Sequence, residues 1–156
     1  MTEDIKIIAT NRKASFEYFL MEKFEAGLVL HGSEIKSIRA GQISIQESYV
    51  DVPNENEAWL LEAHIAPYEQ AGTHFNHEPR RKRRLLLHKR EILKLASATA
   101  IKGCSLPLLR MYWKNRRVKV ELGIGKGKTH TDQRQDLKKQ VELREAQREM
   151  SRFNRR

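Results

Sequence analysis

Two segments in the last third of the chain, 108–113 and 117–124, constrain the fold most strongly. The second segment places apolar residues at every other position, and these are Val118, Val120, Leu122 and Ile124. The charged residues Arg117, Lys119 and Glu121 alternate with them, which is the period-two pattern of a strand with one buried face. Lys114-Asn115-Arg116 separates the two segments as a turn. We therefore predict an antiparallel hairpin and a mainly β fold.

Four other segments complete a predicted set of six strands. A first strand is expected at 5–9 and a long bent strand at 16–30, where Gly27 suggests a bulge. A helix is the alternative for the second segment. The turn 53–56 predicts a second hairpin between 45–52 and 58–66. In its second arm the inward residues are expected to be Trp59, Leu61, Ala63 and Ile65.

Two short helices are predicted between the strands. Ser33 can cap the first, with Ile35 and Ile38 on its buried face and Gly41 at its end. The second is expected at 92–100. Its buried stripe would consist of Ile92, Leu93, Ala96 and Ala100, and Gly103 would end it.

The chain changes character after residue 124. Gly123, Gly125 and Gly127 predict a flexible hinge, and the residues beyond it are almost wholly polar. A thin apolar stripe remains, and isolated helices of this length are marginal in water. We predict a folded unit over 1–124 and a basic tail over 125–156 that is disordered alone and helical against a partner.

The most unusual stretch is the basic run 80–84, which is followed directly by three leucines, 85–87, and by His88, Lys89 and Arg90. Adjacent like charges repel, and a polyanion relieves that repulsion when it binds. The net charge of +10 likewise favours nucleic acid as a partner. The chain has one cysteine and no apolar run of 18 residues, so we expect a cytoplasmic protein without a membrane span.

Catalytic and metal-binding patterns are weak. Gly127-Lys128-Thr129 imitates the end of a phosphate-binding loop, but Leu122 stands where the first glycine is required. His74, His77 and Cys104 do not have the spacing of a zinc site. We therefore predict no enzymatic activity, no cofactor and no metal.

Aromatic rings among basic residues are typical of small RNA-binding barrels, in which bases stack on rings and cations hold phosphates. Tyr112 is expected on the same strand face as Arg110, opposite an inward Trp113. Core positions are expected for Tyr18, Phe19, Phe24 and Trp59. Glu25, at the expected bulge, either accepts a hydrogen bond from a base or is a solvated carboxylate. The segment 11–14 is expected to form an exposed basic turn.

The chain resembles the SsrA-binding protein family, also called small protein B, whose members bind transfer-messenger RNA. The resemblance runs from residue 11 to about residue 150. It is carried by the segments NRKASFEYF, EAGLVLHGSEIKSIRAG, SYV, HIAPY, RRLLLHKREI and YWKNRRVKVELGIGKGK, which appear in family order. It implies a six-stranded antiparallel barrel of the oligonucleotide-binding type, flanked by helices and followed by a flexible tail.

The resemblance also implies a function. Such a protein is a monomeric adaptor that delivers transfer-messenger RNA to stalled ribosomes for trans-translation. Its body grips the RNA, and its tail enters the decoding centre and the empty messenger channel. A generic single-strand-binding barrel or a structural protein of the ribosome would explain the charge and the hairpins equally well, but not the glycines followed by a basic tail.

Family contact positions carry over residue by residue onto Asn11, Arg12, Glu25, Leu86 and Lys119, and Arg83, Arg84 and Lys89 match basic positions of the family. Lys36 is also predicted to bind RNA. The predicted ribosome-contacting residues of the tail are Lys126, Gly127, Lys128, His130, Asp132 and Arg134. The tail departs from the family pattern, because Thr129 and Gln133 replace lysines and Thr131 replaces a ring. Either stacking in the decoding centre is weaker here or His130 substitutes for the missing ring.

Overall fold

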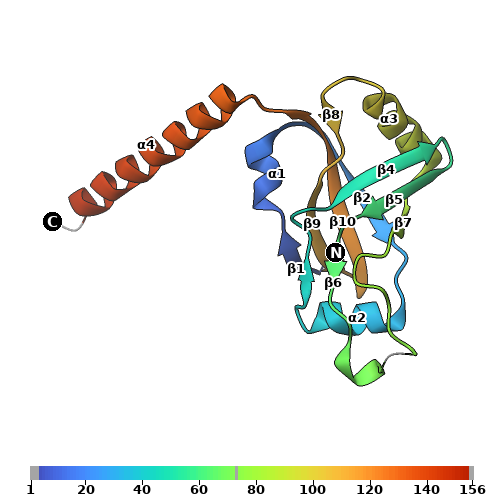
Figure 1. Ribbon diagram of the computed structural model, residues 1–156. Coiled ribbons are helices and arrows are strands. Elements are labelled where there is room, and N and C mark those ends of the chain that lie inside the picture. The colour runs from blue at the N-terminus through green and yellow to red at the C-terminus, as the bar shows by residue number, and fades with distance from the viewer. Residues whose placement is uncertain (1–3, 73, 155–156) are drawn as a thin grey trace.

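The computed structural model describes residues 4–72 and 74–154 and consists of a curled antiparallel sheet, flanking helices and a projecting C-terminal helix (Figure 1). The strands are β1 (Ile5–Thr10), β2 (Tyr18–Leu28), β3 (Ile43–Ser44), β4 (Tyr49–Asn54), β5 (Glu57–Leu61), β6 (His64–Ile65), β7 (Arg83–Leu86), β8 (Cys104–Ser105), β9 (Leu108–Lys114) and β10 (Arg117–Gly127). The helices are α1 (Arg12–Glu17), α2 (Gly32–Arg39), the 3-10 turn η1 (Glu69–Ala71), α3 (Lys89–Thr99) and α4 (His130–Asn154).

The main sheet has eight strands in the order β1-β9-β10-β2-β7-β5-β4, with β8 also paired to β10, and β3 and β6 form a separate pair. The sheet curls until β4 meets the segment that precedes β9. There the Val50 N–H donates to the Leu106 carbonyl at 2.8 Å. The fold is therefore the predicted mainly β barrel with flanking helices. It has more strands than the predicted six, because short pairings extend the sheet.

The predicted β9–β10 hairpin is confirmed. The turn uses positive φ angles at Asn115 and Arg116, as a tight hairpin requires. All four predicted inward residues of β10 are buried, namely Val118, Val120, Leu122 and Ile124. They belong to one continuous core with residues of β4, β5, β9 and α3.

The predicted face of β5 is wrong. Ala58 and Leu60 are fully buried, whereas Trp59 and Leu61 are only partly covered. Glu62 has a φ of 60°, and this left-handed residue interrupts the alternation. Even-numbered residues therefore point inward in β5, whereas after Glu62 the odd-numbered Ala63 and Ile65 are buried.

The predicted exposed turn at 11–14 is instead the start of α1. The Asn11 carboxamide accepts the Ala14 N–H at 3.3 Å and caps this helix, and β2 begins only at Tyr18. Of the four rings assigned to the core, Phe24 is buried, Tyr18 and Trp59 are half-buried, and Phe19 is exposed.

Both central helices begin earlier than predicted. Helix α2 is preceded by His31, whose N–H donates to the Glu34 carboxylate at 2.8 Å, so Ser33 is not its cap. His88 and Glu91 make the same contact, at 3.0 Å, before α3. The buried residues of α3 are Ile92, Leu95 and Ala98, a different stripe from the predicted one. Gly41, with a φ of 74°, follows α2 as predicted.

The glycines 123, 125 and 127 do not form a hinge, because β10 continues through Gly127. The sheet thus extends three residues past the predicted end of the folded unit. A Cβ on Gly125 would lie 2.8 Å from the Tyr18 Cβ, so this glycine permits close packing of β10 on β2.

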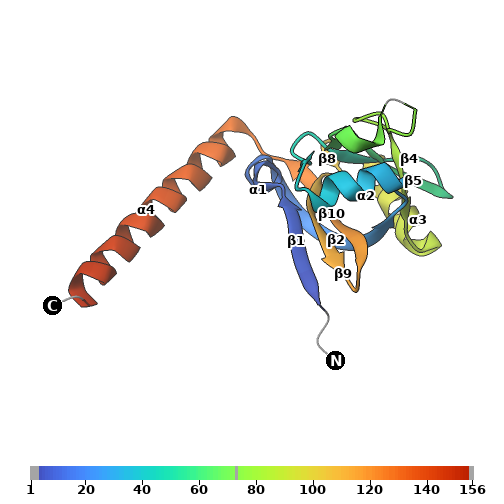
Figure 2. The same ribbon diagram turned by 90° about the horizontal axis from the view of Figure 1, so that it is seen from below.

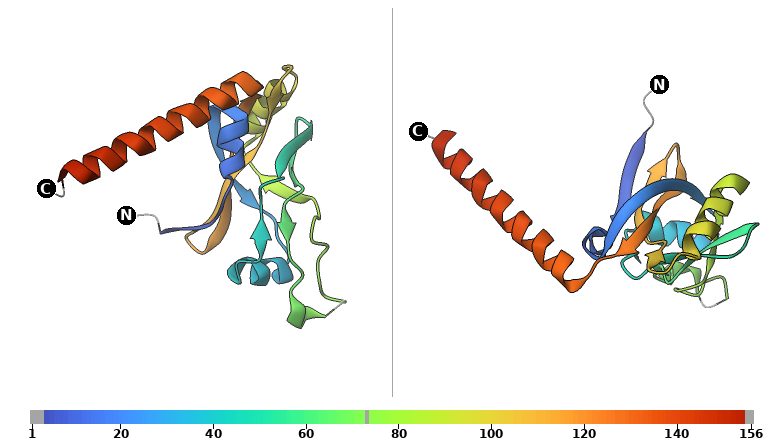
Figure 3. Two further views of the ribbon diagram at one scale, coloured as in Figure 1. Left: turned by 60° about the vertical axis from the view of Figure 1, so that its left-hand side comes forward. Right: turned by 90° about the horizontal axis from the view of Figure 1, so that it is seen from above.

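Helix α4 projects away from the sheet, and its C-terminal end is far from the barrel (Figures 1 and 2). It begins beside α1, as the two views in Figure 3 show. No helix in the described part of the chain is both long and apolar enough to cross a membrane.

Candidate RNA-binding surface

Four neighbouring strands of the main sheet place one residue each in a single cross-strand row. Tyr112 of β9 pairs with Lys119 of β10, Lys119 with Gly27 of β2, and Gly27 with Leu86 of β7. Directly paired residues of an antiparallel sheet share a face, and this is the outer face. The row therefore brings together two predicted RNA contacts, Leu86 and Lys119, that are 33 residues apart in the sequence.

Gly27 makes this proximity possible. A Cβ added to it would lie 3.3 Å from the Leu86 Cβ and 3.6 Å from the Lys119 Nζ. Leu86 is 57% exposed, although a leucine of that size normally packs inside. An exposed leucine beside a lysine presents an apolar contact and a cation to the same ligand.

A groove of about 320 Å³ is bordered by three members of this row, Gly27, Leu86 and Lys119, and by residues of α2. It is lined by Leu86 and Trp113 and by four cationic residues, Arg39, Arg116, Arg117 and Lys119. The Arg39 guanidinium lies 5.8 Å from the centre of the Trp113 ring. None of the described residues that line the groove is acidic. The surface is thus suited to a phosphate backbone.

The sequence did not identify Arg39, Arg116, Arg117 and Trp113 as groove residues. Arg116 was assigned to a turn and Trp113 to the inside of the barrel. The only local signal was the density of cations around the hairpin turn at 114–117. Their convergence with Arg39 depends on how α2 packs against the sheet.

Glu25 lies on the same outer face but at a regular pair with Glu121, so the predicted bulge is wrong. The irregularity in this pairing falls at Ile124 and Gly125. The Tyr112 hydroxyl donates to one Glu25 carboxylate oxygen at 2.5 Å, and the Lys114 ammonium donates to the other at 3.1 Å. The hydrogen bond from Tyr112 is the main reason that the pKa of Glu25 is lowered.

Tyr112 is not a stacking surface. Its ring is buried beneath the outer face, with the Arg110 guanidinium 4.9 Å from its centre, so the shared face with Arg110 is confirmed. Burial, followed by the bond to Glu25, raises the pKa of the Tyr112 hydroxyl. Tyr112 therefore remains protonated and fixes the direction of an ionised Glu25.

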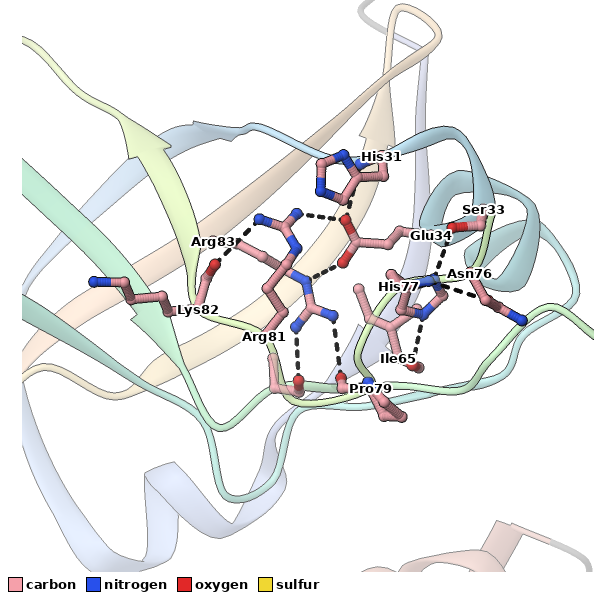
Figure 4. Close-up of polar contacts among 11 residues, drawn as sticks. His31, Ser33, Glu34, Ile65, Asn76, His77, Pro79, Arg81, Lys82 and Arg83 are labelled. Carbon is pink, nitrogen blue, oxygen red and sulfur yellow. Dashed lines mark hydrogen bonds and ion pairs between the residues drawn. The ribbon is translucent and has the colours of Figure 1, made fainter. Parts of the chain in front are cut away.

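Arg83 is the clearest error among the predicted RNA contacts, because its side chain is fully buried (Figure 4). Its Nε donates to the Glu34 carboxylate, and its Nη1 and Nη2 donate to the carbonyls of Ala63 at 2.8 Å and Pro79 at 3.1 Å. Each of its three side-chain nitrogens donates a hydrogen bond inside the protein. Arg83 is thus a structural residue that joins β7 to α2.

Glu34 is the centre of this cluster. It accepts hydrogen bonds from the Arg81 Nη2 at 2.5 Å and from the His31 N–H at 2.8 Å, in addition to Arg83. Burial alone would raise the pKa of Glu34, but the bonds from His31, Arg81 and Arg83 outweigh it, so this pKa is lowered. The cluster withdraws Arg81 and Arg83 from the basic run.

The rest of the run remains outside. Along β7 the side chains alternate, so Arg84 and Leu86 are exposed while Arg83 and Leu85 are buried. The Lys82 ammonium lies 4.6 Å from the centre of the Trp59 ring. Lys89, the first residue of α3, is also exposed.

Asn11 and Arg12 have different roles. The Asn11 side chain is 6% exposed, and its Nδ2 donates to the carbonyls of Leu108 at 2.8 Å and Ile45 at 3.4 Å. It is a structural cap and, in this structure, does not offer its carboxamide to RNA. Arg12 is exposed. Lys36 lies outside the groove, with its ammonium 5.3 Å from the centre of the Tyr68 ring.

The predicted tail contacts are also divided. Lys126 and Gly127 belong to β10 and pair with Phe19 and Tyr18. Lys128 is anchored: its ammonium donates to the Ser15 carbonyl at 3.1 Å and to the Asp136 carboxylate, and its side chain is only 9% exposed. It therefore ties α4 to α1 instead of facing solvent.

The first turn of α4 is closed by a reciprocal cap. The Thr129 N–H donates to the Asp132 carboxylate at 3.1 Å, and the Asp132 N–H donates to the Thr129 hydroxyl at 3.2 Å. The bond from the Thr129 hydroxyl is the main cause of the lowered pKa of Asp132. Arg134 is exposed, and the side chain of His130 lies outside the part that the structure describes.

Known proteins with similar sequences cover nearly the whole chain. The chain is 48% identical to an SsrA-binding protein of Roseiflexus sp. (strain RS-1) over 151 residues, 97% of this chain and 95% of the relative. It is 49% identical to an SsrA-binding protein of Desulforudis audaxviator (strain MP104C) over 150 residues, 96% of this chain and 94% of the relative.

A solved structure is also similar. The work that describes it is called "tmRNA-SmpB: a journey to the center of the bacterial ribosome". The match has a TM-score of 0.65 and 41% identity, and it covers 78% of this chain and 85% of the solved chain. The model of the family described as "SmpB protein" matches residues 8–152. The chain therefore belongs to the SmpB protein family.

Proposed function

We propose that this chain is a non-catalytic adaptor that binds transfer-messenger RNA and brings it to stalled ribosomes for trans-translation. Such work would place it with ribosomes in the cytoplasm. The relatives are named for binding SsrA, and the similar solved structure concerns transfer-messenger RNA, SmpB and the ribosome. The observation that carries the proposal is the row Lys119–Gly27–Leu86 beside a groove with four cations.

Each group on this surface has a distinct part. Lys119 and the three arginines of the groove hold phosphates, and the exposed Leu86 packs against a base or a ribose. Glu25, held ionised and oriented by Tyr112, accepts a hydrogen bond from a base edge. Phosphate contacts alone would bind any RNA, whereas the base contacts of Leu86 and Glu25 allow the surface to prefer one RNA over others.

The test is a charge reversal with a matched control. Lys119→Glu should weaken the binding of transfer-messenger RNA at least tenfold and reduce the slope of log affinity against log salt by about one or more. Lys102→Glu makes the same charge change at an exposed site outside the groove, in the loop after α3, and should have a much smaller effect. Equal losses in the two variants would contradict the proposal.

A further inference from the structure

A second hollow, of about 580 Å³, also borders α2. Residues that line it include His31, Ser33, Lys36, His74, Phe75 and Asn76. No acidic residue occurs among the described residues of its lining. The nearby Glu34 carboxylate is turned away into the pair of arginines behind it (Figure 4).

The wall of this hollow is rigidly built. The Asn76 Oδ1 accepts the Tyr68 N–H at 3.0 Å, and its Nδ2 donates to the Tyr68 carbonyl at 2.8 Å. The buried His77 ring lies between the Ser33 hydroxyl and the Ile65 carbonyl, 2.9 Å from each. These contacts fix the segment that carries Phe75 to both α2 and β6.

Two side chains at this site, Phe75 and Lys36, are exposed. The Phe75 ring is 83% exposed, which forgoes about 1.5–3 kcal/mol of burial for a side chain of this size. The Lys36 ammonium stands over the Tyr68 ring, and in the described residues no carboxylate lies within ion-pair distance of it. An exposed ring and a cation without a counter-ion in the described part of the chain, which line the same hollow, match the base and the phosphate of one unpaired nucleotide.

Helix α2 connects the two sites. Its residues Ile35 and Arg39 line the groove, and Ser33 and Lys36 line the hollow. We propose that the RNA-binding surface continues over α2 into this hollow, where Phe75 stacks on an unpaired base and Lys36 holds an adjacent phosphate. This inference rests on the proposed function. It adds a second nucleotide site, and the nucleotide comes from transfer-messenger RNA or from ribosomal RNA.

The first experiment measures the affinity of the full chain for transfer-messenger RNA. If the nucleotide belongs to that RNA, Phe75→Ala weakens binding about tenfold, the usual effect of losing one base–aromatic stack. Phe75→Tyr keeps the ring and stays within twofold of the original protein. Lys36→Gln lowers the salt slope by about one, whereas Lys36→Arg does not. Urea unfolding measures the stability of each variant. Because both side chains are exposed, we expect the variants to unfold with the same free energy as the original protein.

A second experiment separates the sources of RNA. If Phe75→Ala binds transfer-messenger RNA normally, the preformed complex is titrated onto stalled ribosomes, and a tenfold loss there assigns the nucleotide to ribosomal RNA. A benzophenone attached at Phe75→Cys, in a Cys104→Ser background, should crosslink to RNA. The proposal is overturned by crosslinks to protein alone, or by a Phe75→Ala variant that is normal in both titrations.

The failure of this inference is distinguishable from the failure of the proposed function. Lys119→Glu tests only the sheet face, because Lys119 does not line the hollow. A normal Lys119→Glu with a weakened Phe75→Ala contradicts the sheet-face contact and supports the hollow. A weakened Lys119→Glu together with a Phe75→Ala variant that is normal in both the RNA and the ribosome titration retains the sheet face and removes the hollow.

Discussion

The barrel and helix α4 acquire their conformations in different ways. Every buried apolar residue of the core cluster lies between Phe24 and Ile124. Helix α4 has no such core, and its large apolar side chains, such as Val141 and Phe153, are about half exposed or more. Burial therefore determines the shape of the barrel, whereas α4 depends on its capped first turn and the Lys128–Asp136 contact.

This difference has a functional consequence. A surface built on packed strands would hold the proposed contacts Glu25, Leu86 and Lys119 in place before RNA arrives. A helix without a core can move away from the barrel and pack against a partner at a small cost in free energy, because little buried apolar surface must be exposed. The predicted disorder of the isolated tail remains a prediction, and the same comparison supports it.

Removal of α4 should have the largest effect on function and almost none on RNA affinity. A chain truncated after Thr129 keeps the anchor Lys128 and all of β10. We expect peptide tagging on stalled ribosomes to be abolished, with the affinity for transfer-messenger RNA within about threefold. Filter binding and a tagging assay measure the two quantities. A truncated chain that no longer binds RNA would contradict the separation of barrel and helix.

Glu34→Gln should have the largest effect on stability. The substitution leaves Arg83 buried without its counter-ion, which typically costs about 3–5 kcal/mol. Urea unfolding followed by tryptophan fluorescence reports on the barrel alone, because Trp59 and Trp113 both belong to it. Glu62→Gln is the matched control, since its exposed pair with Arg80 is worth less than about 1 kcal/mol. Similar losses of unfolding free energy in both variants would show that the buried cluster contributes no more to stability than an exposed ion pair.

Gly125→Ala should have the next largest effect. The new methyl group would meet Tyr18 at 2.8 Å, and overpacking of this kind costs about 1–3 kcal/mol. At Gly127 the nearest atom to a new Cβ is 3.9 Å away, so Gly127→Ala should cost less than about 1 kcal/mol. If the two glycines were a hinge, both changes would have equally small effects on the free energy of unfolding.

The basic run shows both what the sequence can disclose and what it cannot. The alternation at 117–124 predicts a strand because the period is local, and it places Lys119 outside. The burial of Arg83 is not predictable in this way, since its counter-ion Glu34 lies 49 residues away in the chain. A run of cations normally indicates a solvated surface. The family resemblance predicts contact positions, but it does not distinguish the exposed Arg84 from the buried Arg83.

The pH dependence of stability should show a smaller effect, confined to the barrel. The pKa of Glu34 is lowered in the folded protein, against an unfolded value of about 4.3. Its contribution is therefore complete above about pH 4.3 and is lost as the pH falls through the folded pKa. Glu34→Gln removes this contribution, so the unfolding free energy of the variant should depend less steeply on pH below about 4.3, by at most about 1.4 kcal/mol per pH unit.

The control for this titration is the chain truncated after Thr129. Other carboxylates of the barrel, such as Glu25, titrate equally in the original protein and in the Glu34→Gln variant, so they cancel in the difference. Asp132 also has a lowered pKa, but it caps α4 and is absent from the truncated chain. The difference between the pH profiles of the original protein and the Glu34→Gln variant should therefore be the same in the full and truncated chains. A difference that disappears with α4 would mean that barrel and helix are energetically coupled, against the independence inferred from their packing.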